Sequence, residues 1–311
     1  MSVYTTITEE ELHNFLSHYQ AGTLIKFEGI LAGIENTNYF VTTDQGEYVL
    51  TLFEQLGWDE LPYFLDIMAF LAEHQVPSAH PIADRNGDYL RWLNQKPAAL
   101  VERLNGSSVD QPTTTQCAAL GSALGRMHAM AHQFSGQRQN PRNIHWCQQS
   151  IDQLSSQLSS EQQQLLSEEL HFQSKTDREN LPQGVIHADL FRDNALFVDE
   201  QLTGIIDFYY ACNDALLYDL AVTLNDWCIS PDGSVDPVRY QSLLDHYQQQ
   251  RPISGREKES WSAMLRAAAL RFWLSRLLDL HFPRAGEMTH TKDPEVFRKI
   301  LMWHRDHPLS V

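Results

Sequence analysis

The stretch "GVIHADLFRDNALF" (residues 184–197) places a histidine, two aspartates, an arginine and an asparagine within eight positions, between two apolar runs. The apolar runs are typical of buried strands, so the polar residues between them need a separate explanation. A polar turn that caps its neighbours is one interpretation, and a site that handles charge is the other. Asp189 and Asn194 lie five positions apart, and Asp207 ends the apolar run "GIIDF" eighteen positions after Asp189. This spacing favours the second interpretation.

Phosphoryl transfer from a magnesium-bound nucleotide requires the groups that these three residues carry. One carboxylate orients the acceptor hydroxyl and takes its proton, while an amide oxygen and a further carboxylate hold hard cations. The segment "ALFVDEQLTGIIDF" (195–208) predicts a β-hairpin that would bring Asn194 and Asp207 together. An H-x-D-x-x-x-x-N pattern alone has low specificity, but with strand, turn, strand and "IDF" after it the pattern indicates a kinase-like site.

The remaining chain predicts a small antiparallel sheet followed by helices. Its 311 residues suggest two lobes, which we place at 1–103 and 104–311 in an α+β fold. The expected elements of the first lobe are a helix capped by Thr8 or Thr6, strands at 23–30, 38–43 and 48–53 with a turn at 44–47, a helix at 61–74 and a hairpin at 89–106. The expected helical segments of the second lobe include 113–132 and one or two solvated helices within 151–172.

Composition limits the classes of partner. The formal net charge of -17 argues against a nucleic-acid or anionic-membrane surface. None of the four cysteines forms a C-x-x-C pair, which argues against a zinc site. With no signal peptide and no run of 18 apolar residues, we expect a cytoplasmic protein without a transmembrane helix. The sequence does not predict an oligomeric state.

Five stretches carry a resemblance to a known family, and the last of them is the most distinctive. They are "ENTNYFV" (35–41), "YVLTLFE" (48–54), "KPAALVERLNG" (96–106), "GVIHADLFRDNALF" (184–197) and "GIIDFYYACNDALLYDLAVTLNDWC" (204–228). Over nearly its whole length the chain resembles the aminoglycoside phosphotransferase family, which has the two-lobed protein-kinase-like fold. Within that family it is most similar to members that phosphorylate the side-chain hydroxyl of L-homoserine with ATP, on the route to threonine.

The resemblance implies roles for the residues of the central stretch. Asp189 is expected to be the catalytic base, and Asn194 and Asp207 to bind magnesium. Asp219, in "LLYDLA", is expected to brace the catalytic loop, and His187 to pack beneath it as a structural residue. An aspartate has an ordinary pKa of about 3.9 and is a weak base for an alcohol, so we expect Asp189 to act mainly by orienting the hydroxyl.

Two segments are candidates for nucleotide binding. In "AGIENTN" (32–38), Gly33 and the side chains of Asn36, Thr37 and Asn38 could surround the phosphates, although a polar hairpin turn is an equal alternative. In the linker "ALVERLNG" (99–106), the resemblance implies that adenine is held by two backbone groups. These are the carbonyl of Glu102 and the amide of Leu104; a plain edge strand and turn is the alternative.

The third strand departs from the kinase pattern. Thr51 lies where a phosphate-binding lysine is expected, and Phe64 lies near the place of its glutamate partner. The loss of both is self-consistent, because either charge alone would be buried without a partner. Lys26, Arg103 or magnesium itself could neutralise the phosphates instead. The departure also keeps open a catalytically silent nucleotide-binding protein.

A zwitterionic acceptor needs a cation for its carboxylate and acids or carbonyls for its ammonium group. The candidates for this pocket are Arg192, Tyr209, Asn213, Asp214, Asn225, Asp226, Trp227, Arg271 and Trp273. Arg192 lies inside the catalytic loop, whereas the spacing of Arg271 suits a solvent-facing or helix-pairing arginine. An aromatic cage of Tyr209, Trp227 and Trp273 would instead suit choline. An aminoglycoside acceptor also remains open.

Overall fold

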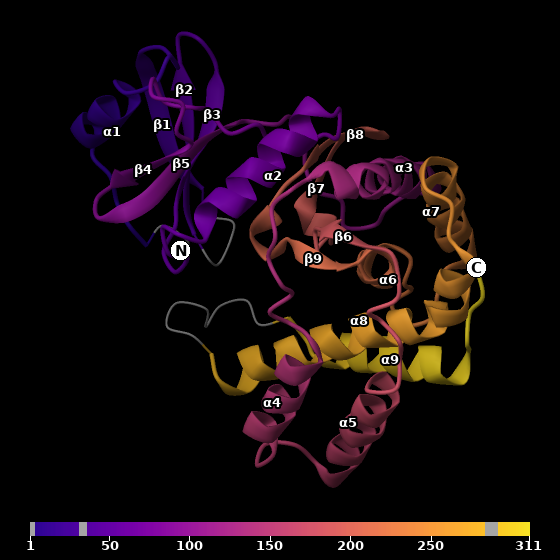
Figure 1. Cartoon of the computed structure of the whole chain (residues 1–311). Helices are drawn as coiled ribbons and strands as arrows, with labels where there is room; N and C mark the ends of the chain where they lie inside the picture. The colour runs from indigo at the N-terminus through magenta and orange to yellow at the C-terminus, as the bar shows by residue number, and fades with distance from the viewer. Residues whose placement is uncertain (1–3, 31–35, 284–291) are drawn as a thin grey trace. The chain divides into compact units, whose positions relative to one another are not determined.

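The computed structural model describes residues 4–30, 36–283 and 292–311. Contacts divide the chain into two compact units. The first comprises Met1–Gly106 with Thr203–Ile206, and the second comprises Ser107–Leu202 with Asp207–Val311. Figure 1 shows the first unit built around a sheet and the second built mainly from helices.

The first unit contains a five-stranded antiparallel sheet with the order β1-β2-β3-β5-β4. Its strands are β1 (Leu24–Ile30), β2 (Thr37–Thr43), β3 (Glu47–Leu52), β4 (Leu90–Leu93) and β5 (Lys96–Glu102). The predicted strands and the hairpin are confirmed to within a few residues. The predicted turn is also confirmed, because the Thr43 amide donates to the Gly46 carbonyl at 2.9 Å.

Helix α1 (Glu9–Leu16) begins where the sequence predicts. Thr8 is its N-cap, and Glu11 completes a capping box with it. The buried side chains of α1 join one apolar cluster with one face of the sheet. Members of this cluster include Leu12, Phe15, Leu16, Tyr39, Val41, Leu50, Leu52, Ala98 and Leu100. Helix α2 (Leu61–Glu73) has Pro62 in its first turn, also as predicted.

The second unit is mainly helical. Its α-helices are α3 (Thr114–Met130), α4 (Ile144–Leu154), α5 (Ser160–Gln173), α6 (Leu216–Trp227), α7 (Pro237–Gln250), α8 (Gly255–His281) and α9 (Glu295–Asp306). Helix α8 contacts α4, α5, α6 and α9, and α3 packs along α7 (Figure 1). Two short strand pairs flank residues 187–194. Strand β6 (Gln183–Ile186) pairs with β9 (Cys212–Ala215), and β7 (Ala195–Val198) pairs with β8 (Gln201–Ile205). The predicted hairpin after Asn194 is therefore confirmed.

The Gln- and Ser-rich segment is largely exposed, as predicted, apart from its leucines and one buried acid. It forms two helices, α4 and α5, and the first already starts at Ile144. Glu169 on α5 has no exposed surface and receives hydrogen bonds from Arg266 of α8. The sequence of α5 alone could not indicate this contact, because the cation that compensates Glu169 comes from a helix nearly a hundred positions later.

Two glycines allow α3 and α7 to approach closely. A methyl group on Gly121 would lie 2.2 Å from the carbonyl oxygen of Leu243, and one on Gly125 would lie 2.7 Å from that of Tyr247. Both obstacles are helix backbone, which cannot move without shifting α7. The small residues therefore set the distance between these two helices.

We expect Gly121→Ala to lower the free energy of unfolding by about 2–3 kcal/mol, since the added methyl group forces the helices apart. Urea unfolding followed by circular dichroism measures this loss. Gly255→Ala is the matched control, because a methyl group there meets nothing within 4 Å. Equal stabilities of the two variants would contradict the expected close approach.

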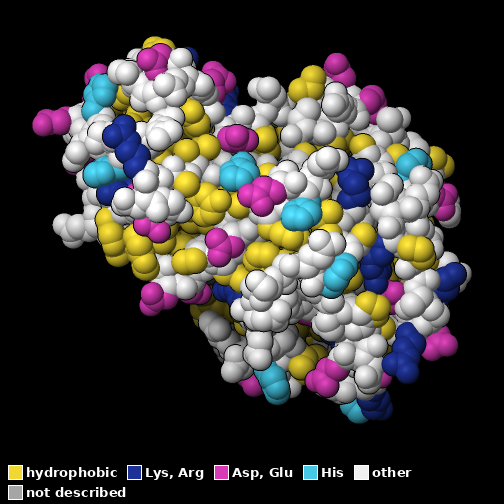
Figure 2. Space-filling model, turned by 45° about the horizontal axis from the view of Figure 1, so that its top comes forward, with side chains coloured by type: hydrophobic (Ala, Val, Ile, Leu, Met, Phe, Trp, Pro, Cys, Tyr) yellow, Lys and Arg dark blue, Asp and Glu magenta, His cyan; other side chains and the backbone are white. Residues whose placement is uncertain are grey.

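Acidic, basic and apolar side chains are interspersed on the face shown in Figure 2. The four cysteines are buried and free. Among the described residues, no helix is long and apolar enough to cross a bilayer.

Candidate functional site

The loop between β6 and β7 is held by one buried carboxylate. Asp219, in the first turn of α6, accepts the amide of His187 at 2.8 Å and the amide of Ala188 at 2.7 Å. Ala188 has a φ of 65°, which is unusual for a residue with a side chain and is stabilised here by the two hydrogen bonds. Asp189 follows directly, so its position depends on this turn.

Asp219 is ionised although it has no exposed surface. Burial alone would raise the pKa of Asp219, but hydrogen bonds from His128 and the loop backbone outweigh burial and hold the pKa below its ordinary value. The Nε2 atom of His128 lies 3.1 Å from the carboxylate. Burial lowers the pKa of His128 despite this neighbour, so the imidazole is neutral at pH 7.

Asp189 lies at the end of the turn with 19% of its side chain exposed. Burial raises the pKa of Asp189 to about 7, the positive charge of Arg271 opposes the rise, and the negative charges of Asp207 and Asp193 add to it. The sequence-based expectation of an ordinary, weakly basic carboxylate therefore needs revision. A carboxyl group with this pKa is matched to proton transfer near neutral pH.

Arg271 of α8 provides the cation nearest to Asp189 among the described residues. Its Nη1 lies 3.8 Å from Asp189 Oδ1, and its guanidinium lies against the ring of Phe272 at 3.7 Å. Only 5% of the residue is exposed. At 3.8 Å the pair is longer than a hydrogen bond, so Asp189 does not saturate the guanidinium donors.

Asn194 and Asp207 offer oxygen ligands that fit a hard cation. The Asn194 amide nitrogen donates to the backbone carbonyl of Asp189 at 2.8 Å and lies 3.3 Å from its carboxylate, which directs the amide oxygen away from Asp189. Asp207 has left-handed backbone angles, φ 64° and ψ 55°, and is exposed. Among the described residues, no group of three His, Cys, Asp or Glu side chains could hold a metal. One carboxylate and one amide oxygen, completed by phosphate and water oxygens, suit Mg²⁺ better than Zn²⁺.

His187 is placed as a scaffold residue would be. It has no exposed surface, its ring lies 4.6 Å from that of Phe208, and its Nδ1 accepts the Asp189 amide at 3.2 Å. The ring thus lies beneath the loop. A structural role for His187 stays our prediction.

The predicted phosphate-binding residues differ in whether their side chains are free to contact a ligand. Gly33 lies outside the described residues, and Asn36 is buried with 9% exposure. The hydroxyl of Thr37 donates to the Glu54 carboxylate at 2.7 Å and accepts two backbone amides near the N-terminus. Because Thr37 has no exposed surface and its hydroxyl is fully engaged, a bond from it to phosphate is a prediction that we withdraw.

Thr51, at the place of the expected lysine, forms a neutral pair with Asn38. The two residues are register partners on β3 and β2, and the Thr51 hydroxyl donates to the Asn38 amide oxygen at 2.7 Å. Phe64 of α2 is fully buried. Of the candidate cations, Lys26 is exposed, whereas Arg103 lies over Phe40 at 4.1 Å and pairs with Glu47 at 3.5 Å.

The predicted adenine-binding segment follows the sheet. Glu102 ends β5, and its amide donates to the carbonyl of His80 at 2.9 Å. Leu104 lies just beyond the strand and is partly exposed. Binding of adenine by the Glu102 carbonyl and the Leu104 amide stays a prediction.

Three predicted acceptor contacts are used by the protein itself. Arg192 pairs with Asp226 through Nε at 3.1 Å and also donates to a backbone carbonyl. Trp227 has no exposed surface, and its indole N–H donates to the Leu190 carbonyl at 3.1 Å, in the loop between β6 and β7. Asp214 receives a bidentate Arg178 guanidinium. These interactions leave Trp227 unavailable to a ligand and neutralise Arg192 and Asp214.

The remaining candidates have mixed placements. The side chain of Asn213 accepts the backbone amide of Arg138 at 2.8 Å, and Tyr209 is partly exposed in the short helix after Asp207. Asn225 is 1% exposed and bonds to the Leu265 carbonyl. Arg271, which the sequence ranks below Arg192, is therefore the better-placed cation. Its helical spacing alone could not reveal that it faces Asp189.

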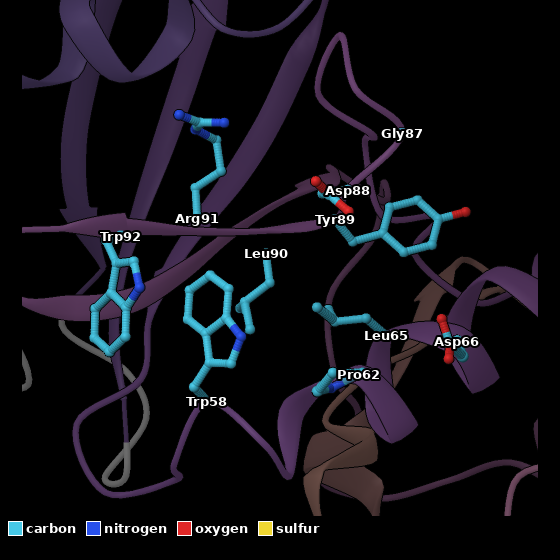
Figure 3. A pocket seen from close by; sticks show the side chains of 10 residues that line it. All are labelled: Trp58, Pro62, Leu65, Asp66, Gly87, Asp88, Tyr89, Leu90, Arg91 and Trp92. Carbon is cyan, nitrogen blue, oxygen red and sulfur yellow. The ribbon is translucent and has the colours of Figure 1, made fainter.

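The first unit also carries a surface hollow of about 510 Å³. Trp58 and Trp92 stack at 4.8 Å on one side of it, and Asp66 and Tyr89 lie toward the other (Figure 3). None of the predicted site residues lines this hollow. Its size alone therefore does not identify it as the predicted site.

Comparison with known proteins decides the family. A model described as "Phosphotransferase enzyme family" matches residues 26–253. The chain belongs to this phosphotransferase family. The predicted resemblance is thereby confirmed, and the matched region includes Asp189, Asn194, Asp207 and Asp219.

Curated relatives of this phosphotransferase cover nearly the whole chain. It is 50% identical over 301 residues to "Homoserine kinase" of Methylobacillus flagellatus, with 97% of this chain and 94% of the relative covered. It is 43% identical over 302 residues to "Homoserine kinase" of Neisseria meningitidis serogroup B, with 97% and 99% covered.

Solved structures confirm the fold class. The amicoumacin kinase hAmiN, solved in complex with AMP-PNP, Ca²⁺ and Ami, is similar with a TM-score of 0.73 at 16% identity, covering 97% of this chain and 95% of that chain. The ethanolamine kinase of Plasmodium vivax has a TM-score of 0.62 at 14% identity, with 98% and 90% covered. The protein-kinase-like α+β fold predicted for this phosphotransferase is therefore correct.

Proposed function

We propose that this small-molecule kinase phosphorylates the side-chain hydroxyl of L-homoserine with ATP and Mg²⁺. Support comes from relatives named homoserine kinase at 41–50% identity over nearly the full length. The observation on which the proposal chiefly rests is the pairing of Asp189 with the buried Arg271 at 3.8 Å. A general base next to an unsaturated guanidinium suits an acceptor that carries both a hydroxyl and a carboxylate.

In this proposal, Arg271 binds the homoserine carboxylate and Asp189 accepts a hydrogen bond from the acceptor hydroxyl. Asp189 takes the hydroxyl proton as the oxygen–phosphorus bond forms, and ADP leaves with the electrons of the broken bond. Fixing the carboxylate at Arg271 orients a short, flexible acceptor. A bidentate arginine contact would provide this orientation.

Asn194 and Asp207 would hold the metal, which supplies positive charge to the phosphate oxygens. This role is consistent with the neutral Thr51–Asn38 pair, since the strand lacks the phosphate-binding lysine of protein kinases. Asn36, Asn38 and the backbone of Glu102 and Leu104 are the proposed nucleotide contacts.

A choline kinase is less well supported. Trp227 and Trp273, two of the three aromatic residues that could form a cage, have no exposed surface. A quaternary ammonium ion requires exposed aromatic faces. A catalytically silent protein is also disfavoured, because Asp189, Asn194 and Asp207 retain the base and the oxygen ligands that phosphoryl transfer requires.

A coupled ADP-release assay over homoserine, choline, ethanolamine and kanamycin tests the proposal. We expect turnover with homoserine alone among the four, and its loss when EDTA removes the divalent metal. If the protein phosphorylated choline or kanamycin but not homoserine, the proposed acceptor would be wrong. ATP binding by calorimetry without turnover of any of the four would indicate a silent nucleotide-binding protein.

Arg271→Gln should raise KM for homoserine by about 10- to 100-fold, because it removes a charge-assisted contact to the carboxylate. The KM for ATP should stay within about 2-fold of the parent value. Initial rates at varied homoserine and saturating ATP measure the effect. Arg276→Gln is the control, since Arg276 lies on the same helix and donates to the Asp293 carbonyl. An unchanged homoserine KM in Arg271→Gln would remove Arg271 from the acceptor site.

A further inference from the structure

A chain of buried polar side chains ends on Asp219, the carboxylate that holds the catalytic loop. We call His128, Tyr247, Arg251 and Glu257 the helix brace. They come from α3, from α7 and the residue after it, and from the first turn of α8. Their side chains are at most 12% exposed, and His128, Tyr247 and Glu257 are essentially fully buried. Such groups are costly to bury unless they are satisfied together.

Each link of the brace is a hydrogen bond. His128 Nε2 lies 3.1 Å from the Asp219 carboxylate, and His128 Nδ1 lies 2.8 Å from the Tyr247 hydroxyl. Arg251 donates through Nη1 to the same hydroxyl at 3.0 Å and through Nη2 to Glu257 at 2.8 Å. The other oxygen of Glu257 accepts the amide and hydroxyl of Ser254, the N-cap of α8.

The chemistry of the brace fixes the direction of its protons. The ionised Asp219 carboxylate can only accept, so the neutral His128 imidazole carries its proton on Nε2 and donates to Asp219. Its Nδ1 then has no proton and accepts the proton of the Tyr247 hydroxyl. Arg251 can only donate, so the Tyr247 oxygen accepts from it. Tyr247 thus supports the tautomer of His128 that Asp219 requires.

Helix packing makes this contact possible. Gly125 lies one turn before His128, and a methyl group there would collide with the Tyr247 carbonyl oxygen at 2.7 Å. The close approach of α3 and α7 at this point brings the imidazole within reach of the Tyr247 hydroxyl. The close packing of α3 against α7 therefore allows the hydrogen bond between His128 and Tyr247.

We propose that His128 and Tyr247 are positioning residues for the phosphoryl transfer: they fix the Asp219 carboxylate, which fixes the Ala188 turn and so the place of Asp189. This inference rests on the proposed function of Asp189. Asp219 accepts the His187 amide and the His128 imidazole on the same oxygen. Without the imidazole, the Asp219 carboxylate keeps only its hydrogen bonds to the loop backbone and loses the one that holds it to α3. A displacement of about 1 Å at a catalytic group can lower the rate 100-fold.

The experiment measures kcat, both KM values and the unfolding midpoint for six proteins. These are the parent, Tyr247→Phe, His128→Gln, His128→Leu, the double variant His128→Gln/Tyr247→Phe and the control Tyr240→Phe. Tyr240 is also a buried tyrosine of α7, and its hydroxyl accepts the Trp261 indole N–H at 2.6 Å, away from Asp219. Rates are taken well below each midpoint and divided by the ATP-binding sites counted by calorimetry.

Tyr247→Phe should lower kcat about 5- to 10-fold, because it removes the donor that holds the His128 ring at Nδ1, and should leave both KM values within about 2-fold. His128→Leu should lower kcat about 30- to 100-fold. His128→Gln, which retains a donor for Asp219, should recover most of that loss. Tyr240→Phe should lower the midpoint as Tyr247→Phe does, but leave kcat within about 2-fold.

The double variant His128→Gln/Tyr247→Phe should be no slower than the slower of the two single variants, because both residues act through the one contact to Asp219. A kcat within 2-fold of the parent in both Tyr247→Phe and His128→Leu would overturn the proposal and leave the brace a purely stabilising feature. If the parent itself does not turn over homoserine, the proposed function fails instead. Should His128→Leu not fold, Tyr247→Phe still decides.

Discussion

Asp189→Ala is expected to lower kcat by about 10²- to 10⁴-fold, which is the usual contribution of a positioned general base. The carboxyl of Asp189 has a pKa near 7 and lies beside Arg271, so it can both orient a hydroxyl and take its proton. The variant should still bind ATP, because the proposed nucleotide contacts lie elsewhere. Steady-state rates with saturating homoserine and ATP, together with calorimetry of ATP, measure the two effects.

Asp199→Asn is the matched control for this prediction. Asp199 is an exposed turn residue with a φ of 54°, in the hairpin between the two proposed metal ligands. Asparagine tolerates this backbone conformation well, so kcat should stay within about 2-fold. If Asp189→Ala kept a kcat similar to that of the control, Asp189 would have no part in the chemistry.

Asp219→Ala is expected to lower the free energy of unfolding by about 3–5 kcal/mol, as removal of one partner from a buried charged network does. The change leaves the amides of His187 and Ala188 without their acceptor in a fully buried place. Urea unfolding of parent and variant at pH 7 gives the difference. The exposed Asp245 on α7 provides the control Asp245→Ala, which should stay within about 0.5 kcal/mol of the parent.

The sign of the pH dependence follows from the lowered pKa of Asp219. A carboxyl whose pKa falls on folding contributes stability that is complete above its unfolded pKa, about 3.9, and is lost as the pH falls through the lower folded value. The stability difference between the parent and Asp219→Ala should therefore shrink on strong acidification. A difference that grows toward low pH would contradict an ionised Asp219 in the fold.

Local sequence patterns were enough to predict most elements of the fold. The hairpin 195–208 was predictable because two short apolar runs flank a polar turn, and α1 because Thr8 and Glu11 form a capping box. The absence of the lysine could be read directly from the sequence of β3. The hydrogen bond of Thr51 to Asn38 on β2 could not.

The acceptor residues were harder to predict because their partners are distant in the sequence. Trp227 supports the Leu190 carbonyl, Asp214 is neutralised by Arg178, and the partners of Arg192 lie 34 and 82 positions away. Residue type alone suggested a binding role in each case, but tertiary hydrogen bonds already use these side chains. Arg271 was underrated for the opposite reason, since only the fold reveals that it faces Asp189.

The most direct test of the account is the product formed from L-homoserine and ATP with Mg²⁺ by the purified protein. Phosphorus NMR of the reaction, with ADP measured in parallel, determines which atom receives the phosphoryl group. We predict one O-phosphohomoserine for each ADP released, and none when Mg²⁺ is chelated. Release of ADP without a phosphate ester of homoserine, or no ADP at all, would contradict the account.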